Sequence, residues 1–248
     1  MKLSVVIPAY NEEALLSRCL SSIVEQVAQA GVEAEIIVVN NASTDHTCEI
    51  AASFAGVRVV DEPRKGLVQA RQAGFVAATG DLIANLDADT RLPPGWMARV
   101  CDRFRRDPAL LALSGPCIYE DLSAPVRVVV HLFYCLAYGS YLLTRFVLNH
   151  SSMLQGGNYV IRRDALSAIG GYNTALEFYG EDTDVAYRLH RIGKVVFTLR
   201  LPIYASGRRL AAEGVLTTGV RYSFNYLWVL LFRRPFSTGY RDIRPPLP

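Results

Sequence analysis

Two aspartates one residue apart, Asp87 and Asp89, are the sharpest chemical signal in the sequence. They follow residues 82–86, an apolar run that predicts a buried strand. Carboxylate oxygens favour a hard cation, Mg²⁺ or Mn²⁺, that keeps open positions for phosphate oxygens. One carboxylate can hold this cation while the other binds a ribose hydroxyl or a metal-bound water. Because the same spacing also occurs in solvated turns, its position directly after a strand is what favours a metal–phosphate site.

A second acidic pair, Glu181 and Asp182, lies in the other half of the chain. A carboxylate near a metal-bound leaving group can act as a general base and take the proton of an attacking hydroxyl. Helix capping is the alternative, because the helix dipole favours acidic side chains in a first turn. Four basic residues are candidates to cover diphosphate charge, with surface ion pairs as their alternative role: Lys65, Arg71, Arg208 and Arg209.

The first 118 residues predict alternating strands and helices that bring such groups together. Strands are expected at 3–7, 36–39, 57–60, 82–86 and 111–114. Helices are expected from residue 15 to Gly31, after Ser43 as an N-cap, and over 67–78. This order is typical of an α/β fold with a mostly parallel sheet flanked by helices, which binds ligands at the carboxyl ends of its strands. The sequence contains neither GxGxxG nor GxxxxGKS or GxxxxGKT, which argues against dinucleotide and P-loop sites.

The second half begins with an apolar segment, residues 128–144, flanked by Arg127 and Arg145. With a rise of about 1.5 Å per residue, such a helix reaches roughly 26 Å, which is borderline for a bilayer. A single crossing would place Asp89 and Asp182 on opposite sides, so it is rejected if they share one substrate. Farther on, helices are expected over 163–169 and 181–191, and a strand over 195–199.

Three arrangements of the apolar segment remain: an interfacial helix, a re-entrant hairpin near Gly139 and Ser140, or a helix buried in a core or an oligomer. Its flanking arginines and its tyrosines favour the interface, and residues 222–232 have the same profile. We therefore expect a cytoplasmic protein attached peripherally to the inner face of the membrane, with a core or oligomer role as the alternative.

Composition indicates a folded chain with little net charge. Its 248 residues are 51% hydrophobic and carry a net charge of +3, which argues against global disorder and against nucleic acid as a partner. From Arg200 onward, eight arginines oppose Glu213 and Asp242, and this excess of +6 suits an anionic membrane or a phosphate-bearing substrate, with a solvated face as the alternative. Five widely spaced cysteines predict buried, reduced thiols rather than disulfides or structural zinc. Residues 1–10 lack the apolar core of a secretory signal.

Taken in order, these segments resemble a family-2 glycosyltransferase of the GT-A fold, of the inverting, bacterial, single-domain type. The resemblance covers about residues 3–210, and the shared order of its motifs makes it specific. The matching segments are 5–12 (VVIPAYNE), 39–47 (VNNASTDHT), 65–74 (KGLVQARQAG), 80–81 (GD), 87–89 (DAD), 156–158 (GGN), 170–172 (GGY) and 180–182 (GED).

The resemblance implies a nucleotide-diphosphate sugar, with UDP favoured, lying across the strand ends. It implies that Asp89 holds Mg²⁺ or Mn²⁺ against the departing diphosphate, and that Asp182 deprotonates the acceptor hydroxyl for in-line attack with inversion. The implied donor-binding residues are Pro8, Tyr10, Glu12, Asn40, Lys65, Arg71, Asp87 and Ala88. The implied pocket for the sugar and the acceptor consists of Gly156, Gly157, Asn158, Tyr172 and Glu181.

Two positions depart from the family pattern. Asn40 stands where many members carry aspartate, and since its amide both donates and accepts, uracil stays readable while the base preference is open. Some members have a late histidine metal ligand, whereas residues 204–210 contain none. Arg208 or Arg209 can replace part of that charge on the diphosphate.

The resemblance divides the chain into three parts: a nucleotide-sugar-binding half (1–118), an acceptor-binding and catalytic half (119–210) with an apolar helix over 126–148, and a basic, membrane-associated segment (211–248). The acceptor, a lipid-linked molecule or a glycan, and the oligomeric state stay open. One alternative is a nucleotide-sugar or lipid-binding scaffold without turnover, which intact Asp89 and Asp182 argue against. The other is a sugar nucleotidyltransferase, which usually needs a glycine-rich basic loop where residues 8–12 read PAYNE.

Overall fold

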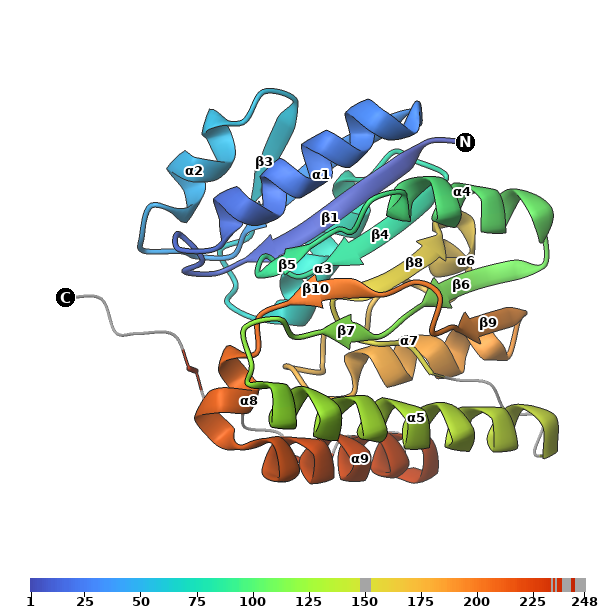
Figure 1. Cartoon of the computed structure of the whole chain (residues 1–248). Coiled ribbons are helices and arrows are strands. Elements are labelled where there is room, and N and C mark those ends of the chain that lie inside the picture. Colours follow the sequence, from blue (N-terminus) through green and yellow to red (C-terminus); the bar gives the residue numbers. More distant parts are fainter. Residues whose placement is uncertain (148–152, 233, 235, 238–241, 244–248) are drawn as a thin grey trace.

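A seven-stranded sheet forms the centre of the computed structural model, which describes residues 1–147, 153–232, 234, 236–237 and 242–243. Its strands lie in the order β3-β2-β1-β4-β8-β6-β9 (Figure 1). Their bounds are β1 (Leu3–Ala9), β2 (Ala34–Asn40), β3 (Val57–Asp61), β4 (Leu82–Leu86), β6 (Leu110–Ser114), β8 (Asn158–Arg162) and β9 (Lys194–Phe197). Within this sheet β8 runs antiparallel to both neighbours and the other pairs are parallel, so the predicted mostly parallel sheet is confirmed.

Each face of the sheet has its own core, because successive side chains of a strand point to opposite sides. Val5 and Ile7 belong to the core beneath α1 (Leu16–Ala30) and α4 (Trp96–Arg106). Val6 belongs to the core beneath α3 (Leu67–Ala77), α6 (Arg163–Ala168) and α7 (Glu181–His190). Burial on both faces explains why the strands read as continuous apolar runs rather than as an alternation.

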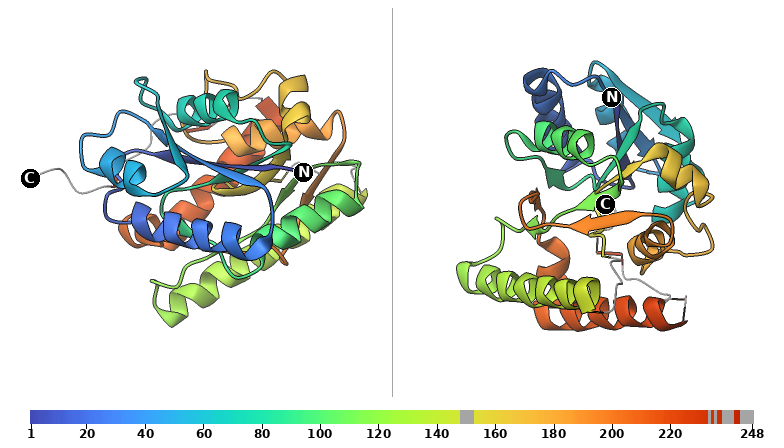
Figure 2. Two further views of the ribbon diagram at one scale, coloured as in Figure 1. Left: turned by 90° about the horizontal axis from the view of Figure 1, so that it is seen from above. Right: turned by 90° about the vertical axis from the view of Figure 1, so that its right-hand side faces the viewer.

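A smaller sheet and further helices complete the described fold. β5 (Thr90–Arg91), β10 (Ile203–Ala205) and β7 (Cys117–Ile118) form this sheet, and α2 (Thr47–Ser53) contacts β3. The apolar helices α5 (Ala124–Val147) and α9 (Val215–Phe232) lie side by side along one side of the molecule, and the short helix α8 (Arg208–Glu213) leads from β10 into α9 (Figures 1 and 2). α9 also contacts α7, so the apolar pair is connected to the helix that begins with Glu181 and Asp182.

The structure corrects the predicted start of the helix after Ser43. The Ser43 hydroxyl oxygen accepts the backbone N–H of Asn11 at 3.2 Å instead of capping a helix. Helix α2 begins at Thr47, whose N–H donates to the Asp45 carboxylate at 3.0 Å. Strand β8 and helix α4 were not among the expected elements, and the proline-rich tail at 244–248 lies outside the described residues.

Two of the three arrangements expected for the apolar segment need correction: the re-entrant hairpin, and the helix buried in a core of this chain. The re-entrant hairpin is wrong, because α5 continues through Gly139 and Ser140 as one helix. The helix expected over 126–148 begins at Ala124, and residue 148 lies outside the described part. A core helix is also wrong for this chain by itself, because the apolar window Ala124–Leu143, long enough to cross a membrane, is only 11% buried.

The prediction of buried cysteines is correct for three of the five. Cys19, Cys101 and Cys117 are buried, whereas Cys48 is half-buried and Cys135, on α5, is exposed. All five lie in the described residues and none is in a disulfide. Burial raises the pKa of Cys19 and of Cys117 to about 12, so these two thiols stay protonated at neutral pH.

Candidate functional site

The carboxyl ends of β1, β2 and β4 meet at one edge of the sheet, because these strands are parallel neighbours. Asn40 is the last residue of β2, and the chain segments that follow β1 and β4 carry Glu12 and Asp87. β8 enters the sheet in the opposite direction, and its first residue, Asn158, pairs with Leu86 at the end of β4. The segment before β8 therefore reaches the same edge, as the sequence motifs require.

Arg71, on α3, joins the two acidic motifs. Its side chain is only 1% exposed, and one guanidinium nitrogen bonds the Asp87 carboxylate at 3.1 Å. The other pairs with Glu181 and donates to the Tyr159 hydroxyl at 2.9 Å. The sequence predicts Arg71 as a contact of the nucleotide, and this stays a prediction; in the structure its two terminal nitrogens bond protein groups, and its Nε has no hydrogen-bond partner among the described residues. Its role in the structure is to connect the segment after β4 with the start of α7.

Two buried phenols form the wall behind Arg71. Tyr172 donates to the Asn85 side-chain oxygen at 2.9 Å, and Tyr159 donates to the Glu181 carboxylate at 3.4 Å. Burial raises the pKa of both tyrosines, so they act here as neutral hydrogen-bonding groups. The expected pocket residue Tyr172 is thus part of the site's supporting layer, and Tyr159 and Asn85 were missed by the sequence analysis because they lie inside strands.

Asp182 lies in the first turn of α7 and is held at both oxygens. One oxygen accepts the backbone N–H of Gly156 at 2.9 Å, and the other accepts the N–H of Thr183 at 2.7 Å. The bond to Thr183 joins neighbouring residues of α7, whereas the bond to Gly156 connects the carboxylate to the segment before β8. Burial raises the pKa of Asp182, although Arg71 works in the opposite direction. A carboxylate with a raised pKa is a better proton acceptor at neutral pH.

Gly156 and Gly157 lie between the two acidic motifs. A side chain at Gly156 would come within 3.4 Å of the Asp182 carboxylate, and one at Gly157 would overlap the Asp87 carboxylate. Gly157 also has a φ of +74°, a conformation that favours glycine. The glycine pair therefore allows Asp87 and Asp182 to approach one short loop from two sides.

Asp89 faces a different arginine. Its carboxylate pairs with Arg208 at 3.1 Å, and the same Arg208 nitrogen bonds Glu12 at 2.5 Å. Burial opposes the charge of Arg208, yet Asp89 and Glu12 outweigh it and raise the pKa of the guanidinium. The two carboxylates thus converge on one cationic atom. This donor set fits a hard divalent cation, whose other ligands would come from phosphate and water, since the described residues contain no cluster of three or more ligating side chains.

The remaining predicted donor-binding residues lie at the ends of β1 and β2 and in the segments that follow β3 and β4. Asn40 donates to the Asp61 carboxylate at 2.8 Å, and the Lys65 ammonium lies 3.8 Å from the Tyr10 ring centroid. Pro8 is half-buried in β1, and Ala88 is 3% exposed. Asp61 was missed by the sequence analysis, although its position at the end of β3, in register with Asn40, is a signal that could have indicated it.

Two predicted residues are turned away from the strand edge. The Asn158 amide donates to the carbonyls of Leu201 at 2.9 Å and Pro116 at 3.2 Å, so its side chain fastens loops. Arg209 pairs with Glu213 at 2.9 Å and lies over the Phe178 ring. Adjacent residues on a helix point in directions about 100° apart, which separates Arg209 from Arg208.

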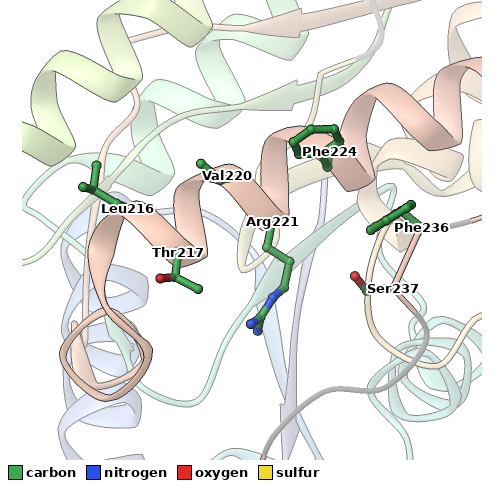
Figure 3. A pocket seen from close by; sticks show the side chains of 7 residues that line it. All are labelled: Leu216, Thr217, Val220, Arg221, Phe224, Phe236 and Ser237. Carbon is green, nitrogen blue, oxygen red and sulfur yellow. The ribbon is translucent and has the colours of Figure 1, made fainter.

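The exposed side of α5 and α9 forms a second distinct surface, the α5–α9 face. Its most exposed apolar residues are Val128, Leu132, Leu136, Leu143, Leu216 and Val220. On α9, a groove of about 480 Å³ has Leu216, Val220 and Phe224 along the helix and Phe236 across from it (Figure 3). A face this rich in exposed apolar residues marks an interaction surface.

Residues 4–170 match the family described as glycosyl transferase family 2. The probable glycosyltransferase YdaM of Bacillus subtilis is 30% identical over 217 residues, which cover 77% of this chain and 47% of YdaM. Chondroitin synthase of Pasteurella multocida is 26% identical over 198 residues, which cover 77% of this chain and 19% of that protein. The chain thus spans less than half the length of either curated relative.

Solved structures agree with this family. The mannosyltransferase PcManGT of Pyrobaculum calidifontis, in complex with GDP-Man and Mn²⁺, superimposes with a TM-score of 0.64 at 21% identity, over 87% of this chain and 62% of its own. Glucosyl-3-phosphoglycerate synthase of Mycobacterium tuberculosis, in complex with Mn²⁺, UDP-glucose and phosphoglyceric acid, gives 0.61 at 23% identity, over 94% and 79%. These likenesses show a GT-A-like fold.

Proposed function

The chain belongs to glycosyl transferase family 2, and from this premise we propose that it transfers a sugar from a nucleotide-diphosphate sugar to an acceptor hydroxyl with inversion at the anomeric carbon. A UDP-sugar is the favoured donor, since similar folds have been solved with UDP or UDP-glucose. The observation that carries the proposal is the Arg71 bridge, which ties Asp87 to the Glu181 that precedes Asp182. Donor and base positions are thereby held in one site.

The donor lies across the ends of β1, β2 and β4 in this proposal. The base and ribose contact the 8–12 segment, Asn40 and Asp87, and Lys65 lies close enough to the Tyr10 ring to close this side of the nucleotide. Asp89 and Glu12 are the residues that would hold Mg²⁺ or Mn²⁺. When bound, the cation supplies electrostatic stabilisation of the departing diphosphate.

Asp182 is the general base. Its carboxylate takes the proton of the acceptor hydroxyl while that oxygen forms a bond to the anomeric carbon. The bond between this carbon and the diphosphate oxygen breaks, and the nucleoside diphosphate leaves with the electron pair. Because Gly156 and Thr183 hold the carboxylate by backbone N–H groups, its orientation is set before the acceptor arrives.

Two substitutions on one helix test this assignment. Asp182→Asn removes the base, and we expect kcat to fall by about 10²- to 10⁴-fold while the affinity for UDP stays within about twofold. Asp184→Asn is the matched control, because Asp184 lies on the same first turn but pairs with Arg188. Unchanged turnover in Asp182→Asn would remove Asp182 as the base.

The donor is tested by thermal shift with UDP, GDP, dTDP and CDP, each with and without Mn²⁺. A ligand at about 100 times its Kd stabilises the protein by about 2.7 kcal/mol, a shift of several degrees for a chain of this size. A Mn²⁺-dependent shift with one nucleotide identifies the base. If folded protein shows no shift with any of them, the proposed donor site is wrong.

We further propose that the acceptor is presented at an anionic lipid surface that contacts the α5–α9 face. The exposed apolar residues of this face supply the area. The net excess of arginines after residue 200 complements anionic headgroups through members other than Arg208, Arg209 and Arg221, which pair with carboxylates of the protein. Through α9, which contacts α7, this surface is connected to the helix of Asp182. The groove on α9 has a size suited to the apolar part of a lipid-linked acceptor.

Flotation with phosphatidylcholine–phosphatidylglycerol vesicles tests the lipid surface. We expect the wild type to float with them, and less so at high salt. Leu136→Glu places a charge at a 73% exposed position of α5 and should abolish flotation, whereas Val76→Glu, at a 75% exposed position of α3, should not. If the wild type does not float, the proposed lipid surface is wrong. If Leu136→Glu instead separates a dimer in analytical ultracentrifugation, the face contacts a second copy of the chain rather than lipid.

A further inference from the structure

Arg208 places its positive charge between the carboxylates of Glu12 and Asp89, where the proposed function puts a divalent cation. One nitrogen of its guanidinium lies 2.5 Å from the Glu12 carboxylate and 3.1 Å from the Asp89 carboxylate. Glu12 follows β1, Asp89 follows β4, and Arg208 comes from the helix that leads into α9, so three distant segments meet at one positive charge. The contact thus links the strand edge to the carboxyl-terminal helices.

The backbone that carries Arg208 is anchored beside Asp89. The Ser206 N–H donates to the Asp89 carbonyl oxygen at 3.2 Å, and the Gly207 N–H donates to the Asp121 carboxylate at 2.8 Å. A side chain at Gly207 would also overlap Leu122, so the main chain here is closely packed. Movement at this position therefore belongs to the Arg208 side chain, which is 30% exposed and long enough to change partners.

A divalent cation and the guanidinium compete for the same carboxylates. Two like charges a few ångströms apart repel each other strongly in a partly buried site. A cation that binds Asp89 therefore displaces Arg208, and the nearest new anion is the diphosphate that arrives with the donor. Guanidinium groups bind phosphate oxygens well through paired N–H groups, so the displaced side chain has a partner.

We propose that Arg208 is an exchangeable counter-ion: it neutralises Glu12 and Asp89 when the donor is absent, and it transfers to the diphosphate when cation and donor bind together. This inference rests on the proposed donor site. Its consequence is that the cation alone binds weakly and the nucleotide alone binds weakly, because either one must overcome the Arg208 contact without the other. Cation and nucleotide binding are coupled through this residue.

The experiment measures Mn²⁺ binding by electron paramagnetic resonance, with no nucleotide and no turnover. Arg208→Met keeps the length of the side chain and removes its charge, and we expect it to bind Mn²⁺ roughly tenfold more tightly than the wild type, within the usual range of such coupling. With Mn²⁺ present it should bind UDP about tenfold more weakly, because the diphosphate loses a partner. The factor by which Mn²⁺ improves UDP binding should therefore fall.

Arg209→Met is the matched control, since Arg209 is the next residue on α8 and pairs with Glu213. We expect it to leave the Mn²⁺ affinity unchanged. Circular dichroism and the thermal midpoint verify that each variant is folded, and Arg208→Lys, which keeps the charge, should bind Mn²⁺ with an affinity closer to that of the wild type.

Three outcomes would overturn the inference. Equal Mn²⁺ affinity in wild type and Arg208→Met would mean that Arg208 does not compete with the cation, and weaker Mn²⁺ binding would mean that it supports the site instead. Equal tightening in Arg209→Met would indicate a general charge effect. Failure of the proposed donor site has a different signature, in which the wild type binds no nucleotide with or without Mn²⁺ and Asp89→Asn leaves Mn²⁺ binding unchanged.

Discussion

Arg71 and Arg208 each hold one aspartate of the Asp87–Asp89 pair, but under opposite conditions. Arg71 is 1% exposed, and its second carboxylate partner, Glu181, is 4% exposed. Arg208 is 30% exposed and comes from a short helix after the last strands; of its two partners, Asp89 is 18% exposed and Glu12 is 4% exposed. Breaking a buried charge pair leaves a charge without solvent or partner, whereas a partly exposed pair separates at little cost. The first arginine therefore maintains the architecture of the site, and the second can take part in binding events.

The largest effect that tests this comparison is the loss of Arg71. Arg71→Ala leaves the buried Glu181 without its cation, and we expect the free energy of unfolding to fall by about 3–5 kcal/mol. Urea denaturation measures it. Arg105→Ala is the control, because the Arg105–Asp102 pair is 62% and 51% exposed and its loss should cost under about 1 kcal/mol. Similar losses in both variants would show that Arg71 is not a structural centre.

The glycine that separates the acidic motifs should give the next largest effect. Gly157→Ala places a methyl group against Asp87 at a positive φ, and we expect a loss of about 1–3 kcal/mol beyond the backbone strain alone. Gly170→Ala isolates that strain, because Gly170 has a φ of +79° and open space around its Cα. Thermal unfolding of the two variants measures the difference between their losses of stability. Equal losses would mean that the Asp87 side chain moves aside at little cost.

A smaller effect than that of Arg71 is expected for Arg208 in the absence of ligands. Arg208→Met should lower the free energy of unfolding by less than Arg71→Ala does, because Arg208 and Asp89 are 30% and 18% exposed, although the second partner, Glu12, is only 4% exposed. Urea denaturation without nucleotide or Mn²⁺ measures this. A loss as large as that of Arg71→Ala would erase the contrast between the two arginines.

The last prediction concerns the effect of Asp182, a neighbour of Arg71, on the pH dependence of the protein's stability. Burial raises the pKa of Asp182 in the folded state, so its ionisation opposes folding as the pH rises. At a pH below the ordinary aspartate pKa the residue is protonated in both states, and Asp182→Asn has little effect. Toward pH 7 the variant should melt at a higher temperature than the wild type. A Tm difference that does not grow with pH would contradict the raised pKa.

The predicted secondary structure is correct where the apolar pattern of a segment matches the burial of its side chains in the structure. Residues 82–86 form β4 as expected, and α1 ends at Ala30 before Gly31, which has the left-handed conformation of a C-cap. Strand β8 was missed because it follows a glycine loop and its pairing partners, β4 and β6, are remote in sequence. The prediction that Ser43 caps a helix was wrong because its hydroxyl can accept a loop N–H as well as a helix N–H. Only the tertiary structure brings the N–H of Asn11 close to it.

The candidate site was likewise predictable only in part. The residue types of Asp87, Asp89 and Asp182, and the strand that precedes the first two, are what led to the prediction of a cation site and a base, because carboxylates can hold a cation or take a proton. Their partners could not be predicted. Arg208 and Arg209 are neighbours of identical type, and only the direction of each side chain on α8 sends one to Asp89 and the other to Glu213.

The sequence by itself determined the α/β alternation, the acidic motifs and the long apolar segment, because these depend on residue type and on spacing along the chain. The tertiary structure alone decided that Arg71 is sealed between Asp87 and Glu181, that Arg208 lies between Glu12 and Asp89, and that α5 leaves its apolar side chains exposed. Each of these depends on which remote segments share a surface. Such contacts arise only when the chain packs into its tertiary structure, because packing decides which charged groups are buried and which partners they have there.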